Sequence, residues 1–235
     1  MQNLKLHVAR VCLQTAFFSA VLVSLIPSSR AWAYDHDTQA WLSLQAQGRF
    51  TETTAFGAYL EATAGASRDQ DAVHERYFRP ALTYRTEAGT FFLGTMIRYD
   101  KNNQHVERRH WVQWSNSYDV DALRVGFRLR QEHRELQGVS IAIYRTRAQI
   151  RLQHEALRIS ESMMPYVSHE FLVNLNDSLP STESGLVQTR TVIGLNTRLR
   201  EDLAFDVGYL GVVSNQTTRD DQFLHVLNMT LQYSF

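Results

Sequence analysis

The sequence has little cysteine, lysine or proline, and no long apolar run. Its 235 residues include one cysteine, Cys12, two lysines and four prolines. A single cysteine excludes an internal disulfide framework, and the lack of about 18 consecutive apolar residues excludes a conventional membrane-spanning helix. Charge of one sign is also missing, because 24 basic residues balance 24 acidic ones. This balance argues against nucleic acid as a partner.

The first 33 residues have the pattern of a secretory signal peptide. A basic start precedes a mostly apolar run at residues 11–26, and Ala31-Trp32-Ala33 fits the small-x-small cleavage rule. We therefore expect export, cleavage after Ala33 and one mature domain at residues 34–235. An anchor helix is the alternative, but polar residues within the run disfavour it. Cleavage removes Cys12 and leaves three more acidic than basic residues.

Apolar and polar residues alternate with a period of two along most of the mature chain. In residues 122–134, for example, Leu, Val and Phe at odd positions oppose Arg, Gly and Glu at even positions. Successive side chains of a strand point to opposite faces, so this pattern predicts a strand with one apolar and one charged face. Eleven segments share the pattern or a weaker form of it: 41–49, 54–65, 76–86, 90–99, 106–117, 122–134, 142–155, 165–175, 186–199, 203–214 and 222–235.

These segments are long for a soluble sheet, and the links between them alternate between short and long. Strands of about 5–6 residues are usual in soluble sheets, whereas a membrane strand needs about 9–11. Short turns at one end and longer loops at the other are typical of an outer-membrane barrel. We therefore predict an all-β protein, a transmembrane antiparallel up-and-down β-barrel of 10–12 strands. A soluble β-sandwich or a lipocalin-like barrel is the alternative.

The strand count is the difficulty, because single-chain bacterial barrels have even numbers of strands. Only seven residues, 34–40, separate the predicted cleavage site from the segment at 41–49. They are too few for another membrane strand. The best prediction is therefore ten strands with a partial N-terminal strand at 41–49.

The chain ends on an aromatic residue that closes an alternating series. A C-terminal aromatic of this kind resembles the signal that the outer-membrane barrel assembly machinery reads. We therefore expect that machinery to be a partner and the bacterial outer membrane to be the location. The predicted assembly signal consists of Leu227, Met229, Leu231, Tyr233 and Phe235.

Several short motifs together resemble a known family. The motifs, in order, are Arg79-Pro80 with Tyr84, Glu107-Arg108-Arg109 with Gln113-Trp114, Arg124 with Phe127 to Glu132, Arg145 and Arg147 with Arg151, the block His169–Asn176, Arg190 with Gly194, Gly208-Tyr209-Leu210, and His225 near Phe235. Their order across nearly all of the mature chain resembles DUF2490, a family of bacterial outer-membrane barrels of unknown function. The resemblance implies a fold and a location but no activity.

The charged face of the predicted strands is the candidate site. Thirteen arginines and six acids are assigned to it, an excess of seven positive charges: Glu61, Arg79, Arg85, Arg98, Glu107, Arg109, Arg124, Arg128, Arg130, Glu132, Arg134, Arg145, Arg147, Arg151, Glu155, Glu170, Arg190, Arg198 and Asp206. A barrel of this size has a narrow interior, and unpaired buried charges are costly. We therefore expect a structural network of ion pairs without transport or catalysis. The excess of arginine leaves a narrow anion-preferring pore as an alternative.

An outer-membrane hydrolase or acyltransferase is a third alternative. His105, His110 and His133 fall near the predicted outer rim, close to several glutamates. No G-x-S-x-G or H-E-x-x-H motif accompanies them, so no catalytic residue is assigned. The sequence predicts no metal site and no cofactor.

The same rim suggests the lipid partners. The run His133-Arg134-Glu135 reads as a charge cluster that could bind lipopolysaccharide phosphates, so outer-membrane lipids and lipopolysaccharide are expected partners. His169 and His225 are assigned to the lipid-facing side, and the oligomeric state stays open.

Overall fold

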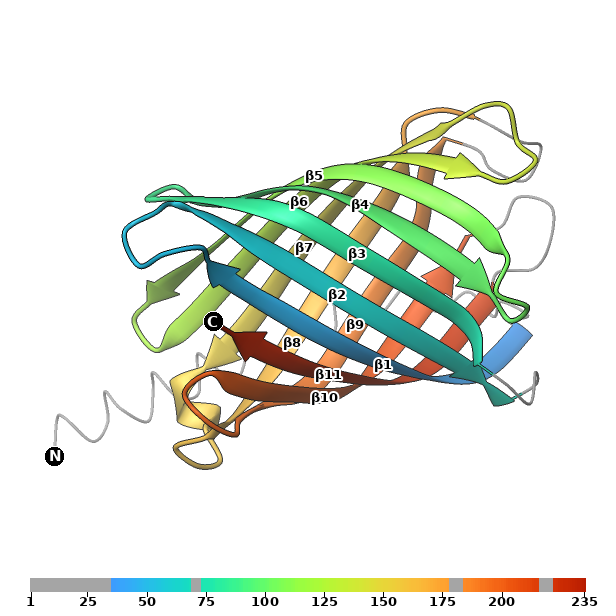
Figure 1. Ribbon diagram of the computed structural model, residues 1–235. Helices are drawn as coiled ribbons and strands as arrows, with labels where there is room; N and C mark the ends of the chain where they lie inside the picture. Colours follow the sequence, from blue (N-terminus) through green and yellow to red (C-terminus); the bar gives the residue numbers. More distant parts are fainter. Residues whose placement is uncertain (1–34, 69–72, 178–183, 216–221) are drawn as a thin grey trace, which may run out of the picture. The chain divides into compact units, whose positions relative to one another are not determined.

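The described part of the chain forms a closed β-barrel (Figure 1). The computed structural model describes residues 35–68, 73–177, 184–215 and 222–235, so the predicted signal peptide lies outside the described residues. Within these ranges there are eleven strands: β1 (Asp35–Arg49), β2 (Phe56–Ser67), β3 (Val73–Thr86), β4 (Gly89–Asp100), β5 (His105–Val120), β6 (Leu123–Leu136), β7 (Ile143–His154), β8 (Met163–Asn174), β9 (Gly185–Arg198), β10 (Leu203–Ser214) and β11 (Gln222–Ser234). One short 3-10 turn, η2 (Glu155–Leu157), follows β7.

Every segment with the two-residue period is a strand in the structure. The shortest of them have 12 residues, as β2 does, and the longest, β5, has 16. Each exceeds the roughly 9–11 residues that a tilted strand needs to cross a bilayer. The prediction of an all-β barrel with long antiparallel strands is therefore confirmed.

The closure of the barrel differs from the expected arrangement. The segment predicted as a partial strand at 41–49 is part of β1, a full strand of 15 residues. β1 pairs in parallel with β11, from Asp35 opposite Gln222 to Gln47 opposite Ser234, and antiparallel with β2. Neighbouring strands of an up-and-down barrel alternate in direction, so a first and an eleventh strand run the same way and can pair only in parallel. The even-number rule for bacterial barrels does not hold here.

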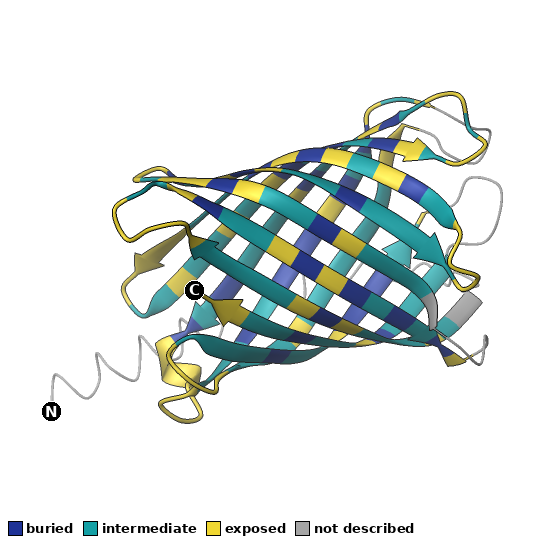
Figure 2. Ribbon diagram, viewed as in Figure 1, coloured by how far each residue is buried: buried dark blue, intermediate teal, exposed yellow. Residues whose placement is uncertain are grey.

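Buried and more exposed residues alternate along several of the strands, as Figure 2 shows. On β6, Leu129 is 51% exposed while its neighbour Arg130 is 3% exposed. Large apolar side chains are exposed on the outside of the barrel, whereas arginines and glutamates are buried inside it. This is the reverse of a soluble protein, which buries its apolar side chains. The distribution fits an outer-membrane-type barrel and not a soluble sandwich or a lipocalin-like barrel.

Part of the barrel interior is apolar. Leu210, Val212 and Val226 form a buried cluster against Trp41 and Val192. These positions share the parity of the charged residues on their own strands, as Leu210 does with Asp206. Apolar residues therefore occur on both faces of the strands, and only the outer face excludes most charges.

The two ends of the barrel differ in their links. The short-turn end carries Phe235 and the links 50–55, 87–88, 121–122, 155–162 and 199–202. The long-loop end carries the links 68–72, 101–104, 137–142, 175–184 and 215–221. Among the described residues, no helix is long and apolar enough to span a membrane.

Candidate functional site

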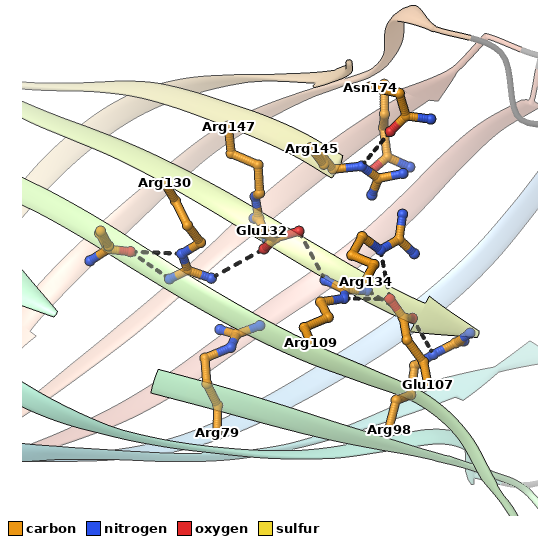
Figure 3. Close-up of polar contacts among 12 residues, drawn as sticks. Arg79, Arg98, Glu107, Arg109, Arg130, Glu132, Arg134, Arg145, Arg147 and Asn174 are labelled. Carbon is orange, nitrogen blue, oxygen red and sulfur yellow. Dashed lines mark hydrogen bonds and ion pairs between the residues drawn. The ribbon is translucent and has the colours of Figure 1, made fainter. Parts of the chain in front are cut away.

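A network of ion pairs inside the barrel has Glu107 as one centre (Figure 3). The Glu107 carboxylate is 0% exposed. It accepts hydrogen bonds from Arg109 Nε at 2.6 Å and Arg134 Nε at 2.6 Å, and from Arg98 Nε at 3.1 Å. Residues opposite one another on neighbouring strands share a face, and Arg98 lies opposite Glu107 while Arg109 lies opposite Arg134. Three strands therefore deliver guanidinium groups to one carboxylate.

Glu132 is the second centre and is 1% exposed. Its oxygens lie 3.1 Å from Arg147 Nη1, 3.6 Å from Arg109 Nη1 and 3.7 Å from Arg130 Nη1. Arg147 also donates two hydrogen bonds to Glu170, at 3.0 and 2.7 Å. The network is thus continuous from β4 to β8.

Two further carboxylates are buried at separate positions. Glu61 accepts from Arg79 Nη1 at 2.6 Å and from the Tyr59 hydroxyl at 2.5 Å. Asp206 accepts from Arg151 Nη1 at 3.2 Å and from the side-chain amides of Asn196 and Gln232. An isolated buried charge costs several kcal/mol, of the order of 3–5 when a partner is removed. Each of these carboxylates has at least one guanidinium partner that offsets this penalty.

The acids of the network are buried, and three of their arginine partners are more exposed than the acids. The side chains of Glu107, Glu170 and Asp206 are 0–5% exposed. The partner side chains of Arg98, Arg128 and Arg151 are 28–32% exposed. At these three pairs the guanidinium group is the more accessible partner from the lumen.

Several arginines have neutral or aromatic partners, which the charge pattern of the sequence did not reveal. Arg130 donates twice to Gln113 Oε1, at 2.8 and 2.6 Å, and lies 4.4 Å from the ring centroid of Trp111. Arg151 lies 3.6 Å from the ring centroid of Tyr166. These partners lie on the same face of their strands as the charged residues. The two-residue alternation of the sequence could therefore have identified them.

Of the predicted lumen residues, Glu155 lies outside the barrel wall, and three arginines lie at the short-turn mouth of the lumen. Glu155 is exposed in η2, where the link after β7 has already left the barrel wall, and it pairs with Arg158. Hydrogen bonds from Arg158 lower the pKa of this exposed carboxyl. Arg85, Arg124 and Arg198 are exposed near the short-turn end of their strands.

Glu75 and Asp37 share the inward parity of their strands and were missed. Glu75 lies 3.8 Å from Arg98 Nη1, and Asp37 accepts from Ser67 and Gln39. They reduce the excess of positive charge that the sequence predicted for the lumen. Arginines still outnumber acids in the interior.

The histidines that suggested an enzyme or a rim cluster are dispersed. His110 and His133 stack on the outer face with ring centroids 6.2 Å apart, and His105 contacts the ring of Tyr99. Arg134 points inward to Glu107, so the predicted His133-Arg134-Glu135 cluster is wrong, because strand neighbours face opposite ways. Arg108 instead lies opposite Glu135 on the outer face.

The other two histidines are on the outer face, as expected from their parity. The ring of His169 bonds the hydroxyl of Thr191 at 2.8 Å, and that of His225 bonds the hydroxyl of Tyr209 at 2.9 Å. No group of three or more potential metal ligands occurs among the described residues.

The lumen is hollowed at the short-turn end. A cavity of about 390 Å³ is lined by residues that include Gln45, Tyr59, Arg85 and Gln232. A second hollow of about 90 Å³ lies among Arg124, Arg158 and Arg198. Tyr59, which donates to Glu61, lines the first cavity, and Asn196, which donates to Asp206, lines the second.

The five residues of the predicted assembly signal share the outer face of β11 and its end. Leu227, Tyr233 and Phe235 are 49%, 44% and 56% exposed. The backbone nitrogen of Phe235 donates to the carbonyl oxygen of Gln47 at 3.1 Å, next to the pairing of β1 with β11. The last residue therefore takes part in closing the barrel.

Comparisons with known proteins give a family and a fold. The family described as "Protein of unknown function (DUF2490)" matches residues 38–223. No curated protein sequence matches the chain. LpxR from Salmonella typhimurium is similar in structure, with 12% identity, a TM-score of 0.43, and coverage of 76% of this chain and 83% of that chain. Outer-membrane expressed OmpT of Vibrio cholerae has 8% identity, a TM-score of 0.38, and coverage of 68% and 55%. Likeness of this degree carries no argument about activity.

Proposed function

The chain belongs to the DUF2490 family, and we propose that it is an integral outer-membrane protein whose lumen is closed by the ion-pair network. Its role is then structural and not catalytic. The buried carboxylates of Glu107 and Glu132 carry the proposal, because each one joins arginines from several strands.

The outer surface supports a membrane location. Leu82, Leu93 and Ile193 are 59%, 62% and 50% exposed on the outer face. Burying an apolar side chain of this size contributes roughly 1.5–3 kcal/mol, so a lipid environment stabilises the barrel where water does not. The export signal expected at residues 1–33 and the C-terminal aromatic belong to the same proposal, with the assembly machinery as partner.

Lipid phosphates are the proposed ligands of the outer face. Arg108 is exposed there, opposite Glu135, and the stacked pair His110 and His133 lies on the neighbouring positions. An arginine beside histidines at the end of an apolar surface can hydrogen-bond phosphate groups. Outer-membrane lipids, including lipopolysaccharide, are therefore the proposed partners at the long-loop end.

A narrow anion-preferring pore is the second candidate. One observation favours it, namely that three half-buried arginines, Arg98, Arg128 and Arg151, are more accessible than the acids with which they pair. A continuous water path lined in this way would attract anions and repel cations.

Planar-bilayer recording of the purified mature barrel under a salt gradient distinguishes a closed lumen from an anion-preferring pore. A closed lumen gives no steady conductance, and replacing Arg128, Arg130 and Arg147 by Gln then lowers thermal stability. Steady anion-selective channels from the wild-type protein, reduced by the same replacements, would assign the protein to the porins. Recovery of the native protein in the soluble periplasmic fraction would refute the membrane location itself.

A further inference from the structure

The arginines at the long-loop end of the network outnumber their acidic partners. Arg98, Arg109, Arg134 and Arg145 lie within a few residues of the ends of their strands at that side. The nearest acids are Glu107, which three of these arginines share, Glu132, which lies 3.6 Å from Arg109, and Glu75, which lies 3.8 Å from Arg98. One carboxylate therefore compensates most of this cluster.

Arg145 has no acidic partner at all. Among the described residues no carboxylate lies within 4.0 Å of its guanidinium group, and its hydrogen bond runs from Nε to the neutral Oδ1 of Asn174 at 2.9 Å. Its cross-strand neighbour Glu132 already lies within 4.0 Å of Arg109, Arg130 and Arg147. A half-buried guanidinium without a counter-charge is unfavourable unless an anion binds to it.

Arg134 and Arg145 are placed to share such an anion. Arg134 lies opposite Ile143 on the neighbouring strand, which makes Arg145 its diagonal neighbour on the inward face. Diagonal neighbours lie about 7–8 Å apart, within reach of long side chains. Only the Nε atom of each arginine donates to a described residue, Arg134 to Glu107 and Arg145 to Asn174. Figure 3 shows both side chains projecting toward the same part of the lumen.

We propose that Arg134 and Arg145, with Arg109 beside them, form an anion-binding site for a phosphate-type oxyanion at the long-loop end of the lumen. The terminal nitrogens of two guanidinium groups offer parallel pairs of donors, which match the oxygens of a phosphate. Chloride is a single atom without such oxygens, so it gains less from the two guanidinium groups. Because the site needs only the folded barrel, it does not depend on whether the lumen conducts.

The site is tested by binding to the mature barrel folded in a maltoside detergent without phosphate. Isothermal titration and thermal unfolding are recorded with inorganic pyrophosphate and, at equal ionic strength, with sodium chloride. We expect pyrophosphate to bind and to raise the unfolding temperature beyond the effect of chloride. Arg145→Gln should weaken binding at least about tenfold, since a hydrogen bond to a charged group contributes this much. Arg145→Lys keeps the charge but loses the paired donors of the guanidinium group. Its affinity for pyrophosphate should lie between those of the wild type and Arg145→Gln.

The matched control is Arg200→Gln, which removes an exposed arginine that pairs with Asp202 in a turn at the other end of the barrel and should bind pyrophosphate like the wild type. Arg145→Gln should fold, since it removes a charge without a counter-charge, and without anion it should unfold at the wild-type temperature or higher. A pyrophosphate effect that is unchanged in Arg145→Gln would overturn the site.

A second arm identifies the source of the phosphate group. The barrel is placed in phosphatidylcholine vesicles with and without phosphatidic acid, and the unfolding temperatures are compared with those obtained with free pyrophosphate. If phosphatidic acid alone shifts the unfolding temperature, and the shift depends on Arg145, the ligand is a lipid headgroup. If pyrophosphate alone gives such a shift, the ligand is a free anion. The absence of both shifts refutes the site. These results are independent of bilayer conductance, so failure of the closed-lumen proposal would be recognised separately.

Discussion

Gly48, near the end of β1, lies against Phe235, the last residue of the chain. A Cβ atom on Gly48 would overlap both the backbone oxygen and the ring of Phe235. Glycine at this position therefore lets the C-terminus approach β1 closely enough for Phe235 N to bond the carbonyl of Gln47. The parallel seam of the barrel ends at this contact.

Replacing Gly48 by alanine should weaken the seam. The added methyl group forces the C-terminal residue away, and overpacking of this kind typically costs about 1–3 kcal/mol. The folded barrel and the heat-denatured barrel migrate differently on a gel. We expect Gly48→Ala to convert from the folded to the denatured band at a lower temperature than the wild type. Gly126→Ala is the control, because a Cβ there meets its nearest atom at an ordinary 3.6 Å. Equal stability of the two variants would mean that the seam tolerates the displacement.

Deleting Phe235 should reduce insertion while export continues. The residue is 56% exposed and closes an apolar series on the outer face, where the assembly machinery could contact it. The measurement is the ratio of heat-modifiable membrane protein to processed protein in the periplasm. Phe127→Ala, which removes an outward aromatic elsewhere, should leave that ratio unchanged. Normal insertion of the truncated chain would remove Phe235 from the assembly signal.

Positions 127 and 128 should label from opposite sides. Phe127 is 39% exposed on the outer face, whereas Arg128 Nη2 lies 2.7 Å from Glu170 inside. The mature chain has no cysteine, so single Cys substitutions report cleanly. We expect a lipid-phase maleimide to label position 127 alone, and Phe127→Arg to cost about 2–4 kcal/mol near mid-membrane. The opposite labelling would reverse the assignment of inside and outside.

Glu132→Gln should destabilise the barrel strongly. The change leaves Arg109, Arg130 and Arg147 without the charge they share, and removing one partner of a buried pair costs about 3–5 kcal/mol. Thermal unfolding followed by circular dichroism measures the loss. Glu155→Gln removes an acid from an exposed turn and should change little. If Glu132→Gln unfolds like the control, the network does not hold the barrel together.

Acid should loosen the turn at residues 155–162 before it opens the barrel. Hydrogen bonds from Arg158 lower the pKa of Glu155 below its ordinary value of about 4.3. A lowered folded-state pKa means that the pair stabilises the turn above the unfolded pKa and loses this effect as pH falls through the folded value. Hydrogen exchange should therefore accelerate in this turn below pH of about 4. If hydrogen exchange in the turn of Glu155→Gln at pH 7 equals that of the wild type, the pair of Glu155 and Arg158 does not stabilise the turn.

The sequence alone determined the strands and their faces. A period of two assigns each side chain to one side of a sheet, so the placement of Leu129 and Arg130 on opposite faces followed directly. The same alternation puts Leu210 and Glu75 on the face of their strands that carries the lumen arginines. It was applied to the arginines but not to apolar or isolated acidic residues. Inside and outside could not be decided from parity, because a sandwich and a barrel share it.

Tertiary structure decided the closure and the pairing of charges. The parallel contact between β1 and β11 joins the two ends of the chain, and no local pattern encodes a contact of such sequence separation. Likewise Arg147 reaches Glu170 and Glu132, but Arg145, two residues away on the same face, reaches Asn174. Strand register and tilt determine which groups meet across the lumen, so the sequence supplied the charges and only the closed barrel determined their partners.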